Sequence, residues 1–172
     1  GANGSEGRIY LEYEFSYMET GINQPEPLAQ QQSCNKVKNQ FTNVSYSSLH
    51  DAINDANPMA IDTLIFLDNV EESFIAYNSV VLKGNGFTLT IPDEIPDVEF
   101  GKMEIDANKT VTWLQGNLIV NPLGIIINGG ILHNKGTIIY NNIDGFSNDG
   151  IYKGSGVFQG NFINYGIVDV GN

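Results

Sequence analysis

Hydrophobic and polar residues follow a repeated pattern in the last third of the chain, in short phrases that each begin with glycine. The phrases start at Gly124, Gly130, Gly136, Gly150, Gly156 and Gly166. The first residue after each glycine is β-branched, a type that favours strands. The second carries a large apolar side chain: Ile126, Leu132, Ile138, Tyr152, Phe158 and Val168. A phrase this short cannot bury a face alone, so the pattern predicts stacked copies that share one core.

Alternation within the phrases also predicts which side chains face the core. Successive strand residues point to opposite faces. We therefore expect Ile126, Leu132, Ile138 and Phe158 inside, and Lys153 and Gln159 outside. Asn128 and Asn134 hold the same place in consecutive phrases, which predicts a ladder of stacked asparagine amides.

The residues before the phrases show one helical and several strand patterns. An apolar stripe of Leu49, Ala52, Ile53 and Ala56 predicts a helix over 47–57, capped by Ser47 or Ser48 and ended before Pro58. Strands are expected at 62–68, 103–106, 110–115 and 117–120. Two more, within 79–91, are separated by a corner at 84–86 that needs positive φ.

The first 44 residues do not share this pattern. Residues 8–18 alternate apolar and polar side chains, which predicts an additional N-terminal strand. Residues 20–43 have no periodicity and are expected to form a long loop. The predicted organisation is therefore an N-terminal strand and loop over 1–44, followed by a solenoid over 45–172. Two prolines and four acids in 92–100 predict a protruding loop.

Three segments that precede the glycine-led phrases resemble the beginning of pectin-lyase-like right-handed parallel β-helix proteins. They are the amphipathic stretch 48–57, the strand 62–67, and Val-Val-Leu-Lys-Gly-Asn-Gly-Phe-Thr-Leu at 80–89. In that superfamily the helix covers the open end of the solenoid. The later Gly-Ile-Leu-x-Asn and Gly-Thr-Ile-x-x-Asn phrases are similar to repeats of secreted adhesins of the filamentous-haemagglutinin type. The resemblance implies an all-β, right-handed parallel β-helix with an N-terminal capping helix.

A second solenoid also repeats every six residues. Left-handed hexapeptide solenoids of acyltransferases keep a small residue and an aliphatic residue in phase through many unbroken turns. Here the phase slips at Gly124 and again between Gly136 and Gly150. We favour the right-handed form.

Charge and composition narrow the classes of partner. The formal net charge is −12, and Arg8 is the single arginine. Nucleic-acid binding depends on neutralising phosphates, so the composition argues against such a partner. The one cysteine, Cys34, permits no internal disulfide. No apolar run approaches the roughly 18 residues of a membrane span.

The sequence contains few residues that fit catalysis. Hydrolases of this fold bring clustered aspartates together, whereas the phrase region offers only Asp144, Asp149 and Asp169. Lyases of the fold use an arginine or lysine base beside calcium-binding acids, and Arg8 lies outside the predicted solenoid. His50 and His133 have no second ligand at zinc spacing. We expect no catalytic site.

Two kinds of ligand contact remain as candidates. Asp144 and Asp149 flank a turn that has the oxygen ligands for calcium, although we favour an Asx-rich turn without a bound ion as the explanation. The acids Asp93, Glu94, Asp97 and Glu99 are a second candidate cation site. The aromatic side chains that either present a face to a sugar or lie in the core are Trp113, Tyr140, Tyr152 and Tyr165.

Two functions follow as expectations. The first is a non-catalytic extracellular or cell-surface module for structure or adhesion, part of a longer β-helical protein, with a surface glycan or protein receptor as partner. The second is a carbohydrate-binding or polysaccharide-degrading β-helix. The last phrase is strand-like and has no cap after it, so we expect a continuation or an oligomeric partner at that end.

Overall fold

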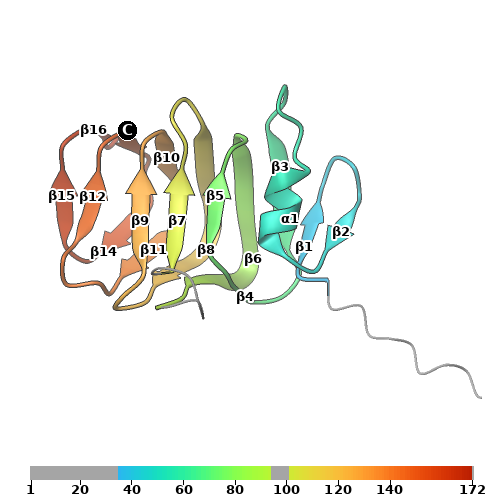
Figure 1. The fold of residues 1–172 in the computed structure, drawn as a ribbon, viewed down its shortest axis with the longest axis horizontal. Helices are drawn as coiled ribbons and strands as arrows, with labels where there is room; N and C mark the ends of the chain where they lie inside the picture. Colours follow the sequence, from blue (N-terminus) through green and yellow to red (C-terminus); the bar gives the residue numbers. More distant parts are fainter. Residues whose placement is uncertain (1–34, 94–100, 172) are drawn as a thin grey trace, which may run out of the picture. The chain divides into compact units, whose positions relative to one another are not determined.

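The computed structural model describes residues 35–93 and 101–171, which form a parallel β-solenoid of about five turns (Figure 1). The chain is mostly strand, with a single short helix near the start of the described region. The parallel β-helix expected from the phrases is confirmed. The predicted strand at 8–18, Cys34, and the acids Glu94, Asp97 and Glu99 lie outside the described residues.

Each coil contributes strands to three sides of the solenoid, which we number in chain order. Side 1 consists of β3 (Asp62–Phe66), the first parts of β6 (Val80–Ile91) and β8 (Thr110–Val120), β10 (Ile131–Asn134), β13 (Ile151–Lys153) and β16 (Ile167–Asp169). Side 2 consists of β4 (Val70–Glu71), the second parts of β6 and β8, β11 (Thr137–Tyr140) and β14 (Val157–Gln159). Side 3 consists of β5 (Phe74–Ala76), β7 (Lys102–Ile105), β9 (Ile125–Asn128), β12 (Phe146–Asn148) and β15 (Phe162–Asn164).

β6 and β8 each bend around the corner between sides 1 and 2. The corner predicted at residues 84–86 is present, because Asn85 and Gly86 have φ of 53° and 93°. The next coil repeats the feature at Gly116, whose φ is 95°. Only a residue that tolerates the left-handed region can occupy such a position. The two strands expected over 79–91 are therefore one bent strand.

The strand register shows that one glycine-led phrase is one side of a coil and not a whole coil. Leu132 pairs with Tyr152, and Tyr152 pairs with Val168, whereas Ile138 pairs with Leu118 and Phe158. The consecutive phrases at Gly130 and Gly136 therefore lie on different sides of the same turn.

This register corrects the expected asparagine ladder. Asn128 pairs with Asn148 on side 3, whereas Asn134 pairs with Trp113 on side 1. The ladder that forms joins successive coils: Asn128 Nδ2 donates to Asn148 Oδ1 at 2.6 Å, and Asn148 Nδ2 donates to Asn164 Oδ1 at 2.8 Å. The residue type was predicted correctly, but the pair Asn128–Asn134 was wrong.

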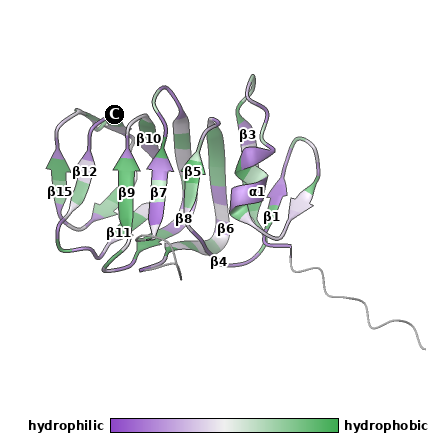
Figure 2. Cartoon of the chain, viewed as in Figure 1, coloured by the Kyte–Doolittle hydropathy of each residue, from purple (hydrophilic) through white to green (hydrophobic). Residues whose placement is uncertain are grey.

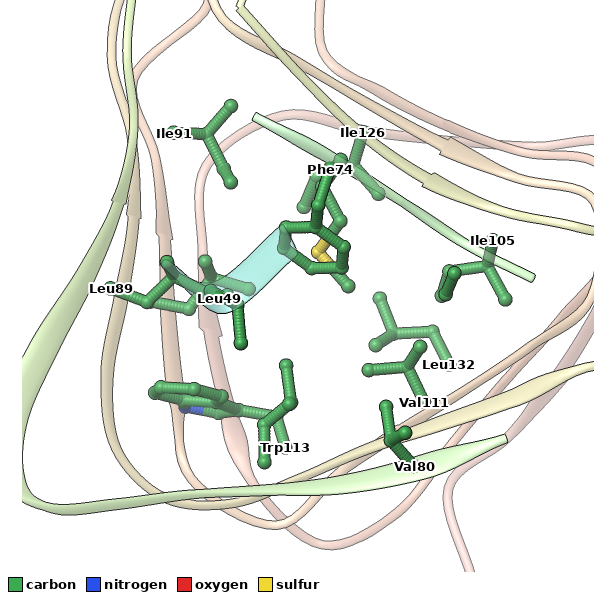
Figure 3. Close-up of a cluster of buried hydrophobic side chains, with 14 of the residues drawn as sticks. Leu49, Phe74, Val80, Leu89, Ile91, Ile105, Val111, Trp113, Ile126 and Leu132 are labelled. Carbon is green, nitrogen blue, oxygen red and sulfur yellow. The ribbon is translucent and has the colours of Figure 1, made fainter. Parts of the chain in front are cut away.

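The core is a continuous apolar column filled from all three sides (Figure 3). Ile126, Leu132 and Ile138 are buried, and Phe158 packs against the core, as alternation predicted. Gln159 is exposed and Lys153 lies on the outer face of β13. Five rings fill the later coils, with centroids of neighbouring rings 5.1 to 6.3 Å apart: Tyr140, Phe146, Tyr152, Phe158 and Phe162.

Helix α1 (Leu49–Asn54) covers the core at its first coil, and a piece of its ribbon lies beside Leu49 in Figure 3. It is shorter than the predicted 47–57. The side chain of Ser48 caps it by accepting a hydrogen bond from Asp51 N. The carboxylate of Glu72 accepts from Leu49 N at 2.9 Å, which places negative charge at the positive end of the helix. Leu49, Ala52 and Ile53 are buried.

Two strands before the helix extend side 1. β1 (Val37–Asn39) pairs antiparallel with β3 and with β2 (Ser45–Tyr46). The loop predicted over 20–43 is therefore wrong in its last part, where β1 forms. A strand of three residues leaves almost no periodic signal in the sequence.

Candidate functional site

Stacking aligns the outward-facing residues of side 1 into two straight rows. Equivalent residues of adjacent parallel strands lie about 4.8 Å apart. The first row is Thr110, Ile131, Ile151 and Ile167. The second row is Thr112, His133, Lys153 and Asp169. Side 1 thus presents a flat surface on which an aliphatic row lies next to a polar row.

Side 3 has a different outer surface. Figure 2 shows β9 and β15 as hydrophobic and β7 as hydrophilic. Ile127 on β9 aligns with Glu104 on β7 and Ser147 on β12, so apolar and polar residues alternate from coil to coil. The continuous aliphatic row is a feature of side 1.

A groove of about 280 Å³ lies at the corner where side 1 turns toward side 2, at the end of the polar row. We call it the corner groove. Its lining residues are His133, Lys135, Lys153, Gly154, Ser155, Asp169 and Gly171. They come from the ends of β10, β13 and β16, so three successive coils form the groove.

The buried side chain of Asn134 holds the first coil of the groove in place. Its Nδ2 donates to Tyr152 Oη at 2.9 Å and to Val157 O at 3.0 Å, and its Oδ1 accepts from Gly136 N at 3.0 Å. Buried amides with all partners present give a rigid local backbone. Asn134 thereby fixes the directions of its two neighbours in the groove, His133 and Lys135.

Gly154 allows the second coil to approach the first. Its φ is 122°, and a Cβ atom there would lie 2.0 Å from Asn134 O and 3.0 Å from His133 Cδ2. Gly154 N also donates to Asp169 O at 3.1 Å, which links the second coil to the third. Any other residue would push Lys153 and Ser155 away from His133.

The electrostatics of the corner groove centre on His133. Burial lowers the pKa of the His133 imidazole, and the positive charges of Lys135 and Lys153 lower it further. Among the described residues, the only ion pair joins Lys102 Nζ to Glu104 Oε2 at 3.1 Å, on side 3. The ammonium groups of Lys135 and Lys153 therefore face the groove without a carboxylate partner from the described part of the chain.

Three of the four predicted sugar-binding rings are in the core. Trp113 is fully buried and its Nε1 donates to Gly116 O at 3.1 Å. Tyr140 and Tyr152 are 4 % and 6 % exposed and belong to the aromatic cluster of the later coils. A sugar cannot reach their faces, so of the two alternatives stated for these rings, the core holds for all three. Tyr165 is 74 % exposed and remains a candidate.

The two aspartates proposed as a calcium site do not converge. Asp144 precedes β12 and Asp149 follows it, so the strand separates them along its length. Within residues 35–93 and 101–171, no group of three or more His, Cys, Asp or Glu side chains is close enough to hold a metal ion. Of the second set of acids, Asp93 accepts a hydrogen bond from Leu123 N at 2.8 Å.

The corner groove was not predicted from the sequence, because Lys153 was expected on the outer face and His133 was considered only as a zinc ligand, so the two were not connected. A usable signal was present: Lys135 and Lys153 are the only basic residues after Lys109. They meet only if the coil, rather than the six-residue phrase, is the unit of stacking.

Two larger hollows are mainly apolar. One, of about 440 Å³, lies beside the turn after α1 and is lined by Phe41, Ala60 and Ile61 among others. Its acid, Asp62, accepts hydrogen bonds from Asn39 Nδ2 at 2.8 Å and Asn57 N at 3.1 Å. The other, of about 460 Å³, includes Pro122, Leu123 and Ile143. These two hollows are larger than the corner groove. The corner groove is nevertheless the better candidate site, because it brings cationic side chains together.

No helix in the described parts of the chain is long and apolar enough to cross a membrane. Comparison with protein-family models, with curated proteins and with solved structures found no significant match.

Proposed function

We propose that this protein is a non-catalytic extracellular or cell-surface module whose solenoid serves structure and adhesion. The resemblance of its phrases to pectin-lyase-like proteins and to haemagglutinin-type adhesins supports this assignment. In such an arrangement the coils are the scaffold, and a flat outer side is the contact surface for a glycan or protein receptor.

The observation that carries the proposal is the aliphatic row on side 1. Ile131 and Ile151 are half-buried by their neighbours, and Ile167 is 59 % exposed. Contiguous exposed apolar surface beside polar residues marks interaction sites on soluble proteins. A row that recurs once per coil also suits a receptor with repeated units, because several weak contacts then act together.

A carbohydrate-binding protein is the second candidate, and the corner groove favours it. Exposed Tyr165 adds an aromatic face at the corner between β15 and β16. This candidate shares the scaffold with the first and differs in the part of side 1 that makes the contact.

The test is retention of the full 172-residue chain on immobilised glycans and matrix proteins. Ile151→Glu places a charge in the aliphatic row and is expected to lower retention about tenfold. Ile139→Glu is the matched control, because Ile139 is an outward isoleucine on side 2, between Ile119 and Gln159. We expect the control to bind like the unmodified chain.

Two results would reject the proposal. One is the same retention in both variants, whether unchanged or reduced, because the aliphatic row would then contribute no more to binding than an isoleucine on side 2. The other is release of reducing ends from acidic polysaccharides during long incubation, since that would make the protein an enzyme. Circular dichroism of each variant confirms that the solenoid is intact.

A further inference from the structure

The corner groove gathers hydrogen-bond donors and positive charge on a protein that is otherwise acidic. The protein has a formal net charge of −12, yet Lys135 and Lys153 line one groove together with His133, which precedes Lys135 by two residues and pairs in register with Lys153. Two positive charges at close range repel each other, and the repulsion is weak only where water surrounds both groups. Here the register of the coils brings them together.

The geometry of the groove is built into the backbone. His133 and Lys153 are register partners, so their Cα atoms lie about 4.8 Å apart on adjacent strands. Asn134 anchors the coil that carries His133 and Lys135, and Gly154 allows Lys153 and Ser155 to approach it. The donors are therefore positioned before any ligand arrives, which lowers the entropic cost of binding.

The chemistry of the lining matches an oxyanion. Lysine ammonium groups only donate, neutral imidazole donates through one nitrogen, and the Ser155 hydroxyl donates or accepts. Charged donors to sulfate or carboxylate oxygens make short, strong hydrogen bonds. Asp169 is the one acid of the groove, at its outer coil, where it is exposed. Its charge opposes an anion and favours a site in the inner part of the groove.

From this arrangement we infer that the corner groove binds the sulfate or carboxylate group of an acidic polysaccharide. The inference rests on the proposed function and specifies the chemical class of the receptor. The groove is open and small, so a single anionic group binds weakly. A polymer supplies many such groups, which raises the effective concentration at the site.

Nuclear magnetic resonance of the two histidines gives a direct test. The full chain is titrated with sodium sulfate, dextran sulfate, polygalacturonate and neutral dextran at constant ionic strength. His133 ring signals should move with sulfate and with the acidic polymers, and stay in place with dextran. His50 is on α1, at the other end of the solenoid, and serves as the internal reference (Figure 1).

The pKa of the His133 imidazole, measured by repeating the titration at several pH values, is a second readout. A bound anion favours protonated imidazole, so the pKa of His133 should rise when sulfate or polymer is present. The charged groups near the ring are Lys135 on its own strand end, Lys153 on β13 and Asp169 on β16, while β8 contributes the uncharged Thr112. The comparison between dextran sulfate and polygalacturonate distinguishes sulfate from carboxylate.

Variants separate this site from general adhesion. Lys153→Gln and Lys135→Gln should each weaken dextran sulfate binding about tenfold. Lys102→Gln on side 3 is the matched control and should have no effect. Asp169→Asn removes the opposing charge and should strengthen binding.

Three outcomes would overturn the inference: equal shifts of His133 and His50, no shift of His133 with any anion, or the same loss in Lys102→Gln as in Lys153→Gln. The proposed function would survive these if Ile151→Glu alone reduces retention. Conversely, Ile151→Glu could bind anions and be retained like the unmodified chain. That result would reject the aliphatic row as the contact surface and would leave the corner groove as the anion site.

Discussion

At the scale of the residue, buried asparagines hold the corners of the solenoid together. Asn148 is fully buried, and its Nδ2 donates to Gly150 O at 3.2 Å and to Ile167 O at 3.2 Å, besides its bond to Asn164. A carboxamide both donates and accepts, so identical residues form a chain of hydrogen bonds along the axis. The ladder ends at Asn128, whose Oδ1 has no donor among the residues that the structure describes, because Ile105 occupies the equivalent place in the coil before it.

Asn148→Ala should lower the free energy of unfolding by about 3 kcal/mol, because it removes the hydrogen bonds that one buried amide makes to Asn128, Gly150, Asn164 and Ile167. Asn161→Ala is the control: Asn161 makes one exposed bond, to Ile143 O at 3.0 Å, and its loss should cost less than about 1 kcal/mol. Urea denaturation followed by circular dichroism measures both. Similar losses in the two variants would show that the ladder contributes nothing beyond surface hydrogen bonding.

At the scale of the element, the glycines that begin the phrases are explained by the close contact of one coil with the next. At the corner between sides 3 and 1, a Cβ atom on Gly130, Gly150 or Gly166 would lie 2.0 to 2.4 Å from a carbonyl oxygen of the preceding coil. The same carbonyls accept the bonds that join the coils, such as Ile151 N to Gly130 O at 2.8 Å. A side chain at any of these glycines would therefore break the backbone hydrogen bonds that join one coil to the next.

Gly150→Ala should destabilise the protein by about 3 kcal/mol, since the added methyl group must displace backbone atoms. Gly171→Ala adds the same methyl group where the nearest atom would be 3.8 Å away, and should change stability by less than about 0.5 kcal/mol. Thermal unfolding of both variants measures the difference. If Gly150→Ala is as stable as Gly171→Ala, close contact does not explain the glycine pattern.

At the scale of the whole molecule, stability should decrease from the middle coils toward β16. β10 pairs with β8 and β13, whereas within the described residues β16 pairs only with β13. The last coil also has a less buried interior: Val168 faces inward yet is 41 % exposed. In a repeat protein each coil is stabilised by its neighbours, so the coil with one neighbour opens most easily.

Amide hydrogen exchange of the full chain tests this gradient. Amides of β10 should exchange at least about a hundredfold more slowly than those of β16, because β16 can open without disturbing the inner coils. Equal protection along the solenoid would contradict the gradient and would indicate that β16 is covered in solution.

The sequence predicted the inside and outside of the coils more accurately than their stacking. Alternation within a phrase is a local property, which is why Leu132 and Phe158 were placed correctly. The same alternation favours the core for Tyr140 and Tyr152, two residues after Ile138 and Gly150, and it decides between the two alternatives left open for these rings. Trp113 lies two residues after buried Val111 and follows the same rule.

The candidate site depended on information that a single strand does not contain. Lys135 and Lys153 are far apart in the sequence, and only the length of a full coil determines that they meet at His133. That length includes the irregular turn at 141–145, which shows no period. The pair Asn128–Asn134 failed for the same reason.

The sequence by itself therefore determined that short glycine-led strands stack into a solenoid, that one helix forms before them, and which residues face the core. These are consequences of side-chain periodicity and backbone sterics, and both act within a few residues. The tertiary structure alone decided the three sides, the strand register, the buried asparagine ladder and the corner groove. Each of these depends on which segments of different coils become neighbours, because hydrogen bonds and charges act between atoms that are close in space.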